Sequence, residues 1–185
     1  MAFDNQRAIR IATDPIAEAR QVKERTGRGI VGTISSWAPD PVILASGAVP
    51  VRLPAPGGDA PVGTRARAHL QAASCFLSQG ILEDGLQGRL DFMDALLFVQ
   101  TCDAQQNLSD ILKMAVPSLP VVDLYMPVNR SSREAVSYLV DELARVMEEL
   151  GEITNTRGSD QDLERELDVR QGVENALADL YDVRA

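Results

Sequence analysis

The stretch Leu96-Leu97-Phe98-Val99-Gln100-Thr101-Cys102-Asp103 is the strongest indication of fold in this sequence. Residues 96–100 suit a buried strand, and the three residues that follow are small, polar and chemically capable. In an open α/β sheet, ligands bind at the carboxyl ends of the strands. The stretch therefore predicts a strand that delivers one thiol, on Cys102, and one carboxylate, on Asp103, to the place where a site would lie.

Segments on both sides of this strand alternate between strand and helix character. Strand character is found at residues 30–35, 49–53 and 121–126, and helical character at residues 15–24, 41–46, 65–82, 104–114, 131–150 and from 160 onward. Such alternation is typical of a mainly parallel sheet with helices on both faces. We predict one α/β domain over residues 1–185, with an open sheet of about four strands. Pro50 indicates either an edge position for the strand at 49–53 or the start of that strand.

Capping residues predict where several of these helices begin and end. Gly27 or Gly29 is expected to end the first helix, and Asp40 and Asp103 are placed to act as N-caps of the helices that follow them. Ser131-Ser132-Arg133-Glu134 has the pattern of a capping box, and Gly151 is expected to stop the helix that it opens.

Two glycine-rich segments are not expected to bind phosphate. Residues 27–32 fit the letters G-x-G-x-x-G, but they follow a helix and enter a strand, the reverse of what a dinucleotide fingerprint requires. Residues 54–63 are rich in proline and glycine and are predicted to be a loop, and no Gly-Lys-Ser/Thr follows them.

Composition excludes several classes of function. The net charge of −9, from 27 acidic and 18 basic residues, argues against non-specific binding to nucleic acid. We find no apolar run near the length of a membrane span and no signal peptide, so we expect a cytoplasmic protein that does not bind membranes. Two cysteines are unlikely to form a structural disulfide there, and they are too few for an all-cysteine metal site within the chain.

The two cysteines each have a structural and a functional interpretation. Cys102 is either a small buried hydrophobe or a thiolate favoured by the helix N-terminus beside it. Cys75 falls within the helix predicted at 65–82, next to Phe76, where a cysteine is more often part of a core. If helix and strand pack together, the two thiols could approach each other.

Other residues near the strand ends are candidates for a substrate pocket. Trp37 and Pro39 follow the first strand on the site side, and Trp37 either belongs to the core or walls a ligand pocket. Asp103 is more simply a helix cap than an acid or a base. His69, the only histidine, is expected to be a solvated residue on a helix, so no Cys-His catalytic pair is assigned.

Three blocks of sequence, taken together, resemble the family of 2-hydroxyacyl-CoA dehydratase and benzoyl-CoA reductase subunits. The first block, GTISSWAPDPVILASGAVPVRL at residues 32–53, resembles the family's strand, the short helix after it and the Ala-Ala-Gly-x-x-Pro turn. The second is Ala73-Ser74-Cys75, and the third is Thr101-Cys102-Asp103 with the later strand at 120–127. The resemblance covers a core at residues 29–150, about the first half of a full subunit.

The resemblance implies a flavodoxin-like fold and an iron–sulfur enzyme acting on acyl-CoA. Subunits of the family hold a [4Fe–4S] cluster with three cysteines, and Cys75 and Cys102 match the first two of them. Two related subunits form a heterodimer, and an ATP-dependent iron–sulfur activator supplies one electron. That electron makes a ketyl radical anion, from which water is eliminated, or it serves the reduction of an aromatic acyl-CoA. Ser36, Trp37, Pro39 and Asp103 then become candidates for the substrate pocket.

The match also has a gap. The family's third cluster cysteine lies in a second domain, and residues 158–183 would form the helix that leads toward that domain. A lyase-type activity is therefore expected only when another domain or subunit completes this one, and the cluster's ligand set is incomplete in this chain. Alternatives left open are a half-size relative that acts as an assembly or binding module without a cluster, and a stand-alone thiol enzyme that uses Cys102.

Overall fold

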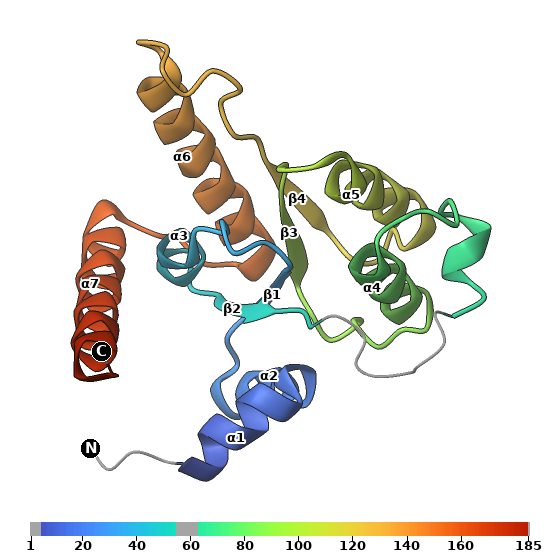
Figure 1. Cartoon of the computed structure of the whole chain (residues 1–185), viewed down its shortest axis with the longest axis horizontal. Coiled ribbons are helices and arrows are strands. Elements are labelled where there is room, and N and C mark those ends of the chain that lie inside the picture. Colours follow the sequence, from blue (N-terminus) through green and yellow to red (C-terminus); the bar gives the residue numbers. More distant parts are fainter. Residues whose placement is uncertain (1–4, 55–62, 185) are drawn as a thin grey trace.

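The structure, a computed structural model, describes residues 5–54 and 63–184 and is built on a parallel sheet (Figure 1). The sheet has the order β2-β1-β3-β4, and every neighbouring pair is parallel. The strands are β1 (Ile30–Thr33), β2 (Val49–Arg52), β3 (Ala95–Val99) and β4 (Val121–Leu124). This strand order is that of a flavodoxin-like sheet. The predicted fold class is confirmed, as is the edge position of the strand that contains Pro50.

Helices cover both faces of the sheet. They are α1 (Asn5–Thr13), α2 (Pro15–Thr26), α3 (Asp40–Ala45), α4 (Phe76–Leu86), α5 (Asp103–Ala115), α6 (Ala135–Thr154) and α7 (Asp160–Arg184), with a short 3-10 helix η1 (Ala66–Ala68). The core on one face includes residues of α4 and α5, and the core on the other includes residues of α3 and α6. Helix α7 packs outside the sheet layers, against α3. Among the described residues, none of the helices is both long and apolar enough to span a bilayer.

Strand β3 shows how one short sequence serves both cores. Leu96 and Phe98 point to the α4–α5 side, whereas Ala95, Leu97 and Val99 point to the α3–α6 side. All five side chains are at most 1% exposed. Side chains alternate along a strand, so a strand covered on both faces reads as a continuous apolar run.

The segment before β3 differs from the sequence prediction. One helix was expected at 65–82 with Cys75 near its middle, but the chain forms η1, a turn, and then α4 from Phe76. Cys75 is instead the N-cap of α4, with extended backbone angles of φ −62° and ψ 146°. The carboxylate of Glu83 accepts the Ala66 N–H at 2.8 Å, and this contact ties η1 to α4. The prediction was wrong because a long-range hydrogen bond outweighs local helix propensity here.

The ends of α6 were also predicted incorrectly. The helix begins at Ala135, and its N-cap Glu134 makes no side-chain capping bond, so the residues 131–134 do not form the expected capping box. Gly151 does not stop the helix, which ends at Asn155 in the left-handed conformation at φ 54°. Gly151 is needed for close packing instead, since a Cβ there would lie 2.7 Å from the Thr156 carbonyl oxygen.

Smaller differences concern single residues at helix starts. Asp40 and Asp103 are the first residues of α3 and α5, and the N-caps are Pro39 and Cys102. Gly27 ends α2 in the left-handed conformation, as predicted, at φ 68°. Helix α1 was not predicted, and most of the loop expected at 54–63 lies outside the described residues.

Candidate functional site at the carboxyl edge of the sheet

All four strands end at the same edge of the sheet, because every pair is parallel. From β1 the chain passes to β2 on one side, and it then crosses to β3 on the other. The carboxyl ends of β1 and β3 therefore flank the point where the strand order reverses, which is where open α/β sheets bind ligands. Residues 34–39 and 100–103 lie at this point.

Cys102 lies at this edge as the N-cap of α5. Its carbonyl oxygen accepts the first hydrogen bonds of the helix, from the N–H groups of Gln105 and Gln106, both at 3.1 Å. Its thiol is exposed and makes no capping bond to the described part of the chain. The alternative of a buried core cysteine is therefore wrong, and the thiol sits free beside a helix N-terminus, whose partial positive charge favours anions.

Cys75 occupies the equivalent place on α4. Helix α4 leads into the start of β3, so its N-terminus lies at the carboxyl edge. The Cys75 sulfur accepts the Ser78 N–H at 3.4 Å and lies 3.0 Å from the Ser78 hydroxyl. It too is a free, exposed cysteine. Because α4 and α5 pack side by side, the structure brings both thiols to one edge, each at the start of a helix.

The substrate-pocket candidates border the same edge. Trp37 is 59% exposed, so the interpretation as a core residue is wrong. The guanidinium of Arg130, from the segment between β4 and α6, lies 5.6 Å from the centre of the indole ring. Ser36 is exposed, and Pro39 is the N-cap of α3. Together they place an apolar ring and a cation beside the end of β1, and nothing in the sequence pattern pointed to Arg130.

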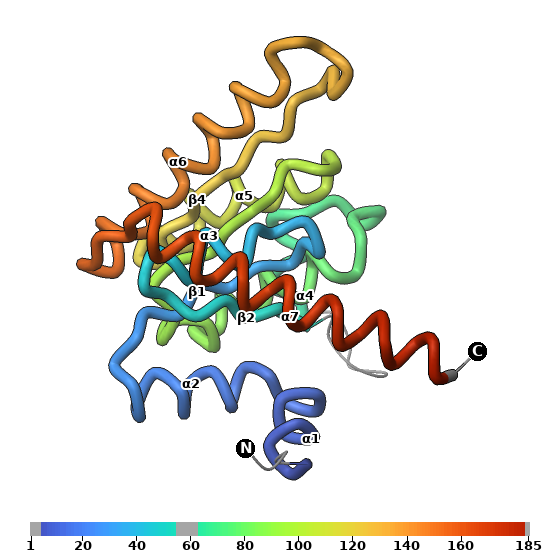
Figure 2. Tube along the Cα trace, turned by 90° about the vertical axis from the view of Figure 1, so that its left-hand side faces the viewer, coloured from blue at the N-terminus to red at the C-terminus, as the bar shows by residue number. Residues whose placement is uncertain are grey.

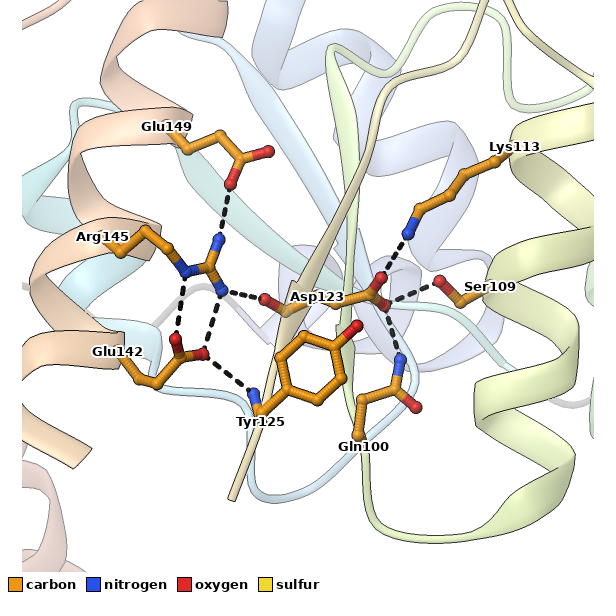
Figure 3. Close-up of polar contacts among 8 residues, drawn as sticks. All are labelled: Gln100, Ser109, Lys113, Asp123, Tyr125, Glu142, Arg145 and Glu149. Atoms are coloured by element: carbon orange, nitrogen blue, oxygen red, sulfur yellow. Dashed lines mark hydrogen bonds and ion pairs between the residues drawn. The ribbon is translucent and has the colours of Figure 1, made fainter. Parts of the chain in front are cut away.

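A buried carboxylate on β4, that of Asp123, fixes the backbone near Cys102 (Figure 3). One carboxylate oxygen accepts hydrogen bonds from the Gln100 amide at 2.5 Å and the Ser109 hydroxyl at 2.6 Å. The other oxygen accepts from the ammonium of Lys113. We call these four residues the Asp123 cluster. Gln100 leads directly into the turn before Cys102, so the cluster sets the position of that turn.

A second charged group lies on the other side of β4. Arg145 of α6 donates to the Asp123 carbonyl oxygen and pairs with Glu142 at 3.0 Å and Glu149 at 2.7 Å. The hydrogen bond from Arg145 lowers the pKa of Glu142. Burial alone would lower the pKa of Lys113, but its hydrogen bond to Asp123 and the charge of that carboxylate raise it above the usual value. Lys113 and Arg145 therefore stay cationic and Glu142 anionic at neutral pH, as suits structural ion pairs.

Glu83 of α4 holds the segment that precedes Cys75. In addition to the Ala66 N–H, its carboxylate accepts the side-chain amide of Gln87 at 2.6 Å. Burial raises the pKa of Glu83, but these hydrogen bonds and the nearby charge of Arg65 outweigh burial and lower it overall. The carboxylate is therefore ionised at neutral pH and anchors the connection from η1 to Cys75.

Comparison with known proteins identifies the family. The model of the 2-hydroxyglutaryl-CoA dehydratase D-component family matches residues 35–185, which include both cysteines. The chain belongs to this family. It is 28% identical over 168 residues to one of the subunits of benzoyl-CoA reductase from Thauera aromatica, covering 90% of this chain and 43% of the relative.

Two relatives named as dehydratase subunits match in the same way. The beta subunit of lactoyl-CoA dehydratase from Anaerotignum propionicum is 27% identical over 85% of this chain and 41% of its own length. The (R)-phenyllactyl-CoA dehydratase beta subunit of Clostridium sporogenes is 23% identical over 79% of this chain and 38% of its own length. The chain thus spans about two fifths of these relatives, which are subunits of larger enzymes by their names.

The dehydratase-family chain presents two thiols at the carboxyl edge. Thiolates are the usual ligands of such clusters, and Cys75 and Cys102 are exposed and free at one edge. Within residues 5–54 and 63–184 there is no group of three or more His, Cys, Asp or Glu side chains placed to hold a metal. His69 is exposed next to η1 and joins neither thiol in such a group. The described residues thus include two exposed thiols but no complete metal-binding group.

Proposed function

We propose that this chain is part of a subunit of a 2-hydroxyacyl-CoA dehydratase-type enzyme. In this proposal Cys75 and Cys102 bind a [4Fe–4S] cluster, and another polypeptide or domain supplies the remaining cysteine. Membership of the family supports the first part. The observation that carries the second is the placement of two exposed, free thiols on the N-termini of neighbouring helices at one sheet edge. The proposal places the enzyme in the cytoplasm, with an ATP-dependent iron–sulfur activator as electron donor.

Each residue at the edge has a task in this proposal. Cys75 and Cys102 would supply thiolate ligands from the starts of α4 and α5, since the thiolate is the form of cysteine that binds iron. When bound, the cluster would supply one-electron transfer to the acyl-CoA thioester. Trp37 and Arg130 offer an aromatic face and a cation to a substrate that carries a purine ring and phosphates. Ser36, Pro39 and Asp103 line the approach between the ends of β1 and β3.

Iron and sulfide analysis of the anaerobically assembled complex tests the proposal. The chain is purified with the polypeptide of the same organism that matches the remaining length of its relatives. We expect about four iron and four sulfide per complex, the composition of a [4Fe–4S] cluster. Cys75→Ser and Cys102→Ser should each abolish or convert the cluster, and Thr101→Ser should leave it intact. A complex without iron, or one indifferent to both cysteine changes, would reject the catalytic proposal.

A module without a cluster is the second candidate. Its motive is that the sequence has two cysteines, one fewer than the three that hold the cluster in the family it resembles. In that case the double variant Cys75→Ser/Cys102→Ser would assemble with its partner and support full activity of the complex. Loss of activity in the assembled double variant would reject this second candidate.

A further inference from the structure

Helix α7 extends beyond the sheet on the side of the candidate site. It starts at the C-terminal end of α3, where a Cβ on Gly158 would lie 2.6 Å from the Ala45 carbonyl oxygen. Further along, Arg170 lies 3.5 Å from the carboxylate of Asp40, the first residue of α3. Helix α7 therefore runs antiparallel to α3, toward the carboxyl edge. The part of α7 after Arg170 is about 20 Å long at 1.5 Å per residue, and Figure 2 shows this part of the helix reaching beyond the rest of the fold.

The extended part of α7 carries an apolar stripe that nothing in the described chain covers. All side chains from residue 167 to 183 are exposed. The stripe consists of Val169, Val173, Leu177 and Leu180, which are 57%, 51%, 48% and 54% exposed. Their spacing of four, four and three residues places them on one face of a helix. Helices this poorly packed are marginal in water, since most helical stability in proteins comes from burying an apolar face.

The charges on α7 argue against a second copy of this chain as the occupant. The helix has eight acidic and three basic residues, so it holds five of the nine excess negative charges in the chain. Two α7 helices packed together would bring these like charges close to one another, which opposes association. A surface with an apolar centre and a rim of Lys and Arg side chains would complement both the stripe and the charge.

We propose that the α7 stripe is the docking surface for the companion polypeptide, meaning the polypeptide that supplies the length of the family relatives not matched here. The identity of this companion rests on the proposed function. The position and exposure of the stripe on α7 are independent of that proposal. This chain spans only 38% to 43% of its relatives, so most of their length has no counterpart in the residues matched here. Helix α7 reaches the carboxyl edge on the α3 side of the sheet, whereas Cys75 and Cys102 begin helices on the other side of the sheet. A partner that sits on the stripe and extends across this edge would bring its own ligands to the two thiols.

A matched pair of variants tests the dock. Leu177→Asp puts a charge into the stripe, and Asn175→Asp puts the same charge on the opposite side of α7. Both positions are exposed, so the isolated chains should keep the wild-type circular dichroism spectrum and melting temperature. In titrations with the companion polypeptide, Leu177→Asp should weaken binding at least about tenfold, as central interface residues do, and Asn175→Asp by less than about twofold.

Two further measurements show whether the companion polypeptide or a second copy of this chain occupies the α7 stripe. Amide hydrogens of residues 171–184 should exchange fast in the chain alone and slow down when the companion is added. Raising the salt concentration should weaken the complex, as expected for an acidic helix in a basic groove. Equal binding by both variants, unchanged exchange, binding insensitive to salt, or self-association of the chain that Leu177→Asp abolishes would each overturn the proposal.

The iron content of the same complex distinguishes this proposal from the proposed function. If Leu177→Asp weakens the complex but the complex holds no iron, the docking proposal is supported and the proposal of a cluster is rejected. If the complex holds iron and Leu177→Asp does not weaken it, the docking proposal is rejected and the proposal of a cluster is supported.

Discussion

The Asp123 cluster and the carboxyl edge lie next to each other, but their polar groups differ in burial and in hydrogen bonding. The carboxylate of Asp123 is buried and accepts three hydrogen bonds from Gln100, Ser109 and Lys113. At the edge, Cys102 is exposed and its thiol makes no capping bond within the described residues. The polar groups of the first region find their hydrogen-bond partners within this chain. The thiol of the second region is exposed and can bind a ligand or a partner molecule.

This difference separates residues that hold the fold from residues free to bind. A buried charge is tolerated only when partners replace the water it loses. An exposed thiol has no such requirement, and replacing it changes few contacts. We therefore expect large effects on stability from the Asp123 cluster and almost none from the cysteines, with effects on cofactor content in the reverse order.

Asp123→Ala should produce the largest loss of stability. The change leaves the buried Ser109 hydroxyl and the Gln100 amide without their acceptor, and each unsatisfied group typically costs about 1–3 kcal/mol. The Lys113 ammonium also loses its partner, but its side chain is 41% exposed and stays in contact with water. Urea denaturation followed by circular dichroism measures the free energy of unfolding. Asp141→Ala, on the exposed side of α6, serves as the control and should stay within about 0.5 kcal/mol of wild type. A similar small change for Asp123→Ala would contradict the structural role of the cluster.

Glu83→Gln should have an intermediate effect that depends on pH. The amide keeps one acceptor for the Ala66 N–H but cannot also accept from Gln87, and an unsatisfied buried group costs about 1–3 kcal/mol. The pKa of Glu83 is lowered in the folded state. Its contribution is therefore complete above the pKa of glutamate in the unfolded chain and is lost as the pH falls through the lower folded value.

Paired unfolding curves for the wild type and Glu83→Gln test this pH dependence. The stability difference should be full at neutral pH and should shrink at roughly pH 3, below the unfolded glutamate pKa of about 4.3. Glu148→Gln, exposed on α6, should show little difference at either pH. A difference for Glu83→Gln that grows in acid would contradict the lowered pKa.

Local signals in the sequence predicted the sheet but not the surroundings of the site. The apolar run that includes Leu96 and Phe98 identified a buried strand, because burial on both faces leaves a continuous pattern. Cys75 was placed inside a helix, since the contact from Glu83 to Ala66 joins residues 17 positions apart. Arg130 reaches Trp37 across the fold. Pairings between distant residues leave no local pattern, so a single sequence does not reveal them.

Asp123 carried a signal that could have been used. A carboxylate within the apolar run Val121-Val122-Asp123-Leu124 is expensive to bury, which indicates buried partners even though it does not name them. By contrast, family resemblance singled out the cysteines, and the structure adds that both are exposed and begin neighbouring helices.

Trp37→Ala should affect stability only slightly. The ring is more than half exposed, and its contact with Arg130 is of the kind worth about 0.5–1 kcal/mol at exposed sites. If the ring walls the acyl-CoA pocket, the assembled enzyme should show a raised KM with little change in the melting temperature of the isolated chain. A drop in stability of several kcal/mol would instead place Trp37 among the residues that hold the fold.

The cysteine variants should have the smallest effect on stability. Serine keeps the size and the hydrogen-bonding capacity of Cys75 toward Ser78, and Cys102 has no capping bond to lose. Cys75→Ser and Cys102→Ser should therefore each unfold within about 0.5 kcal/mol of the wild type, as surface changes usually do. Measured on the chain alone, this result sharpens the contrast with Asp123, because an iron loss in the assembled variants could not then be ascribed to unfolding. A loss near that of Asp123→Ala would remove the contrast and make the thiols part of the fold.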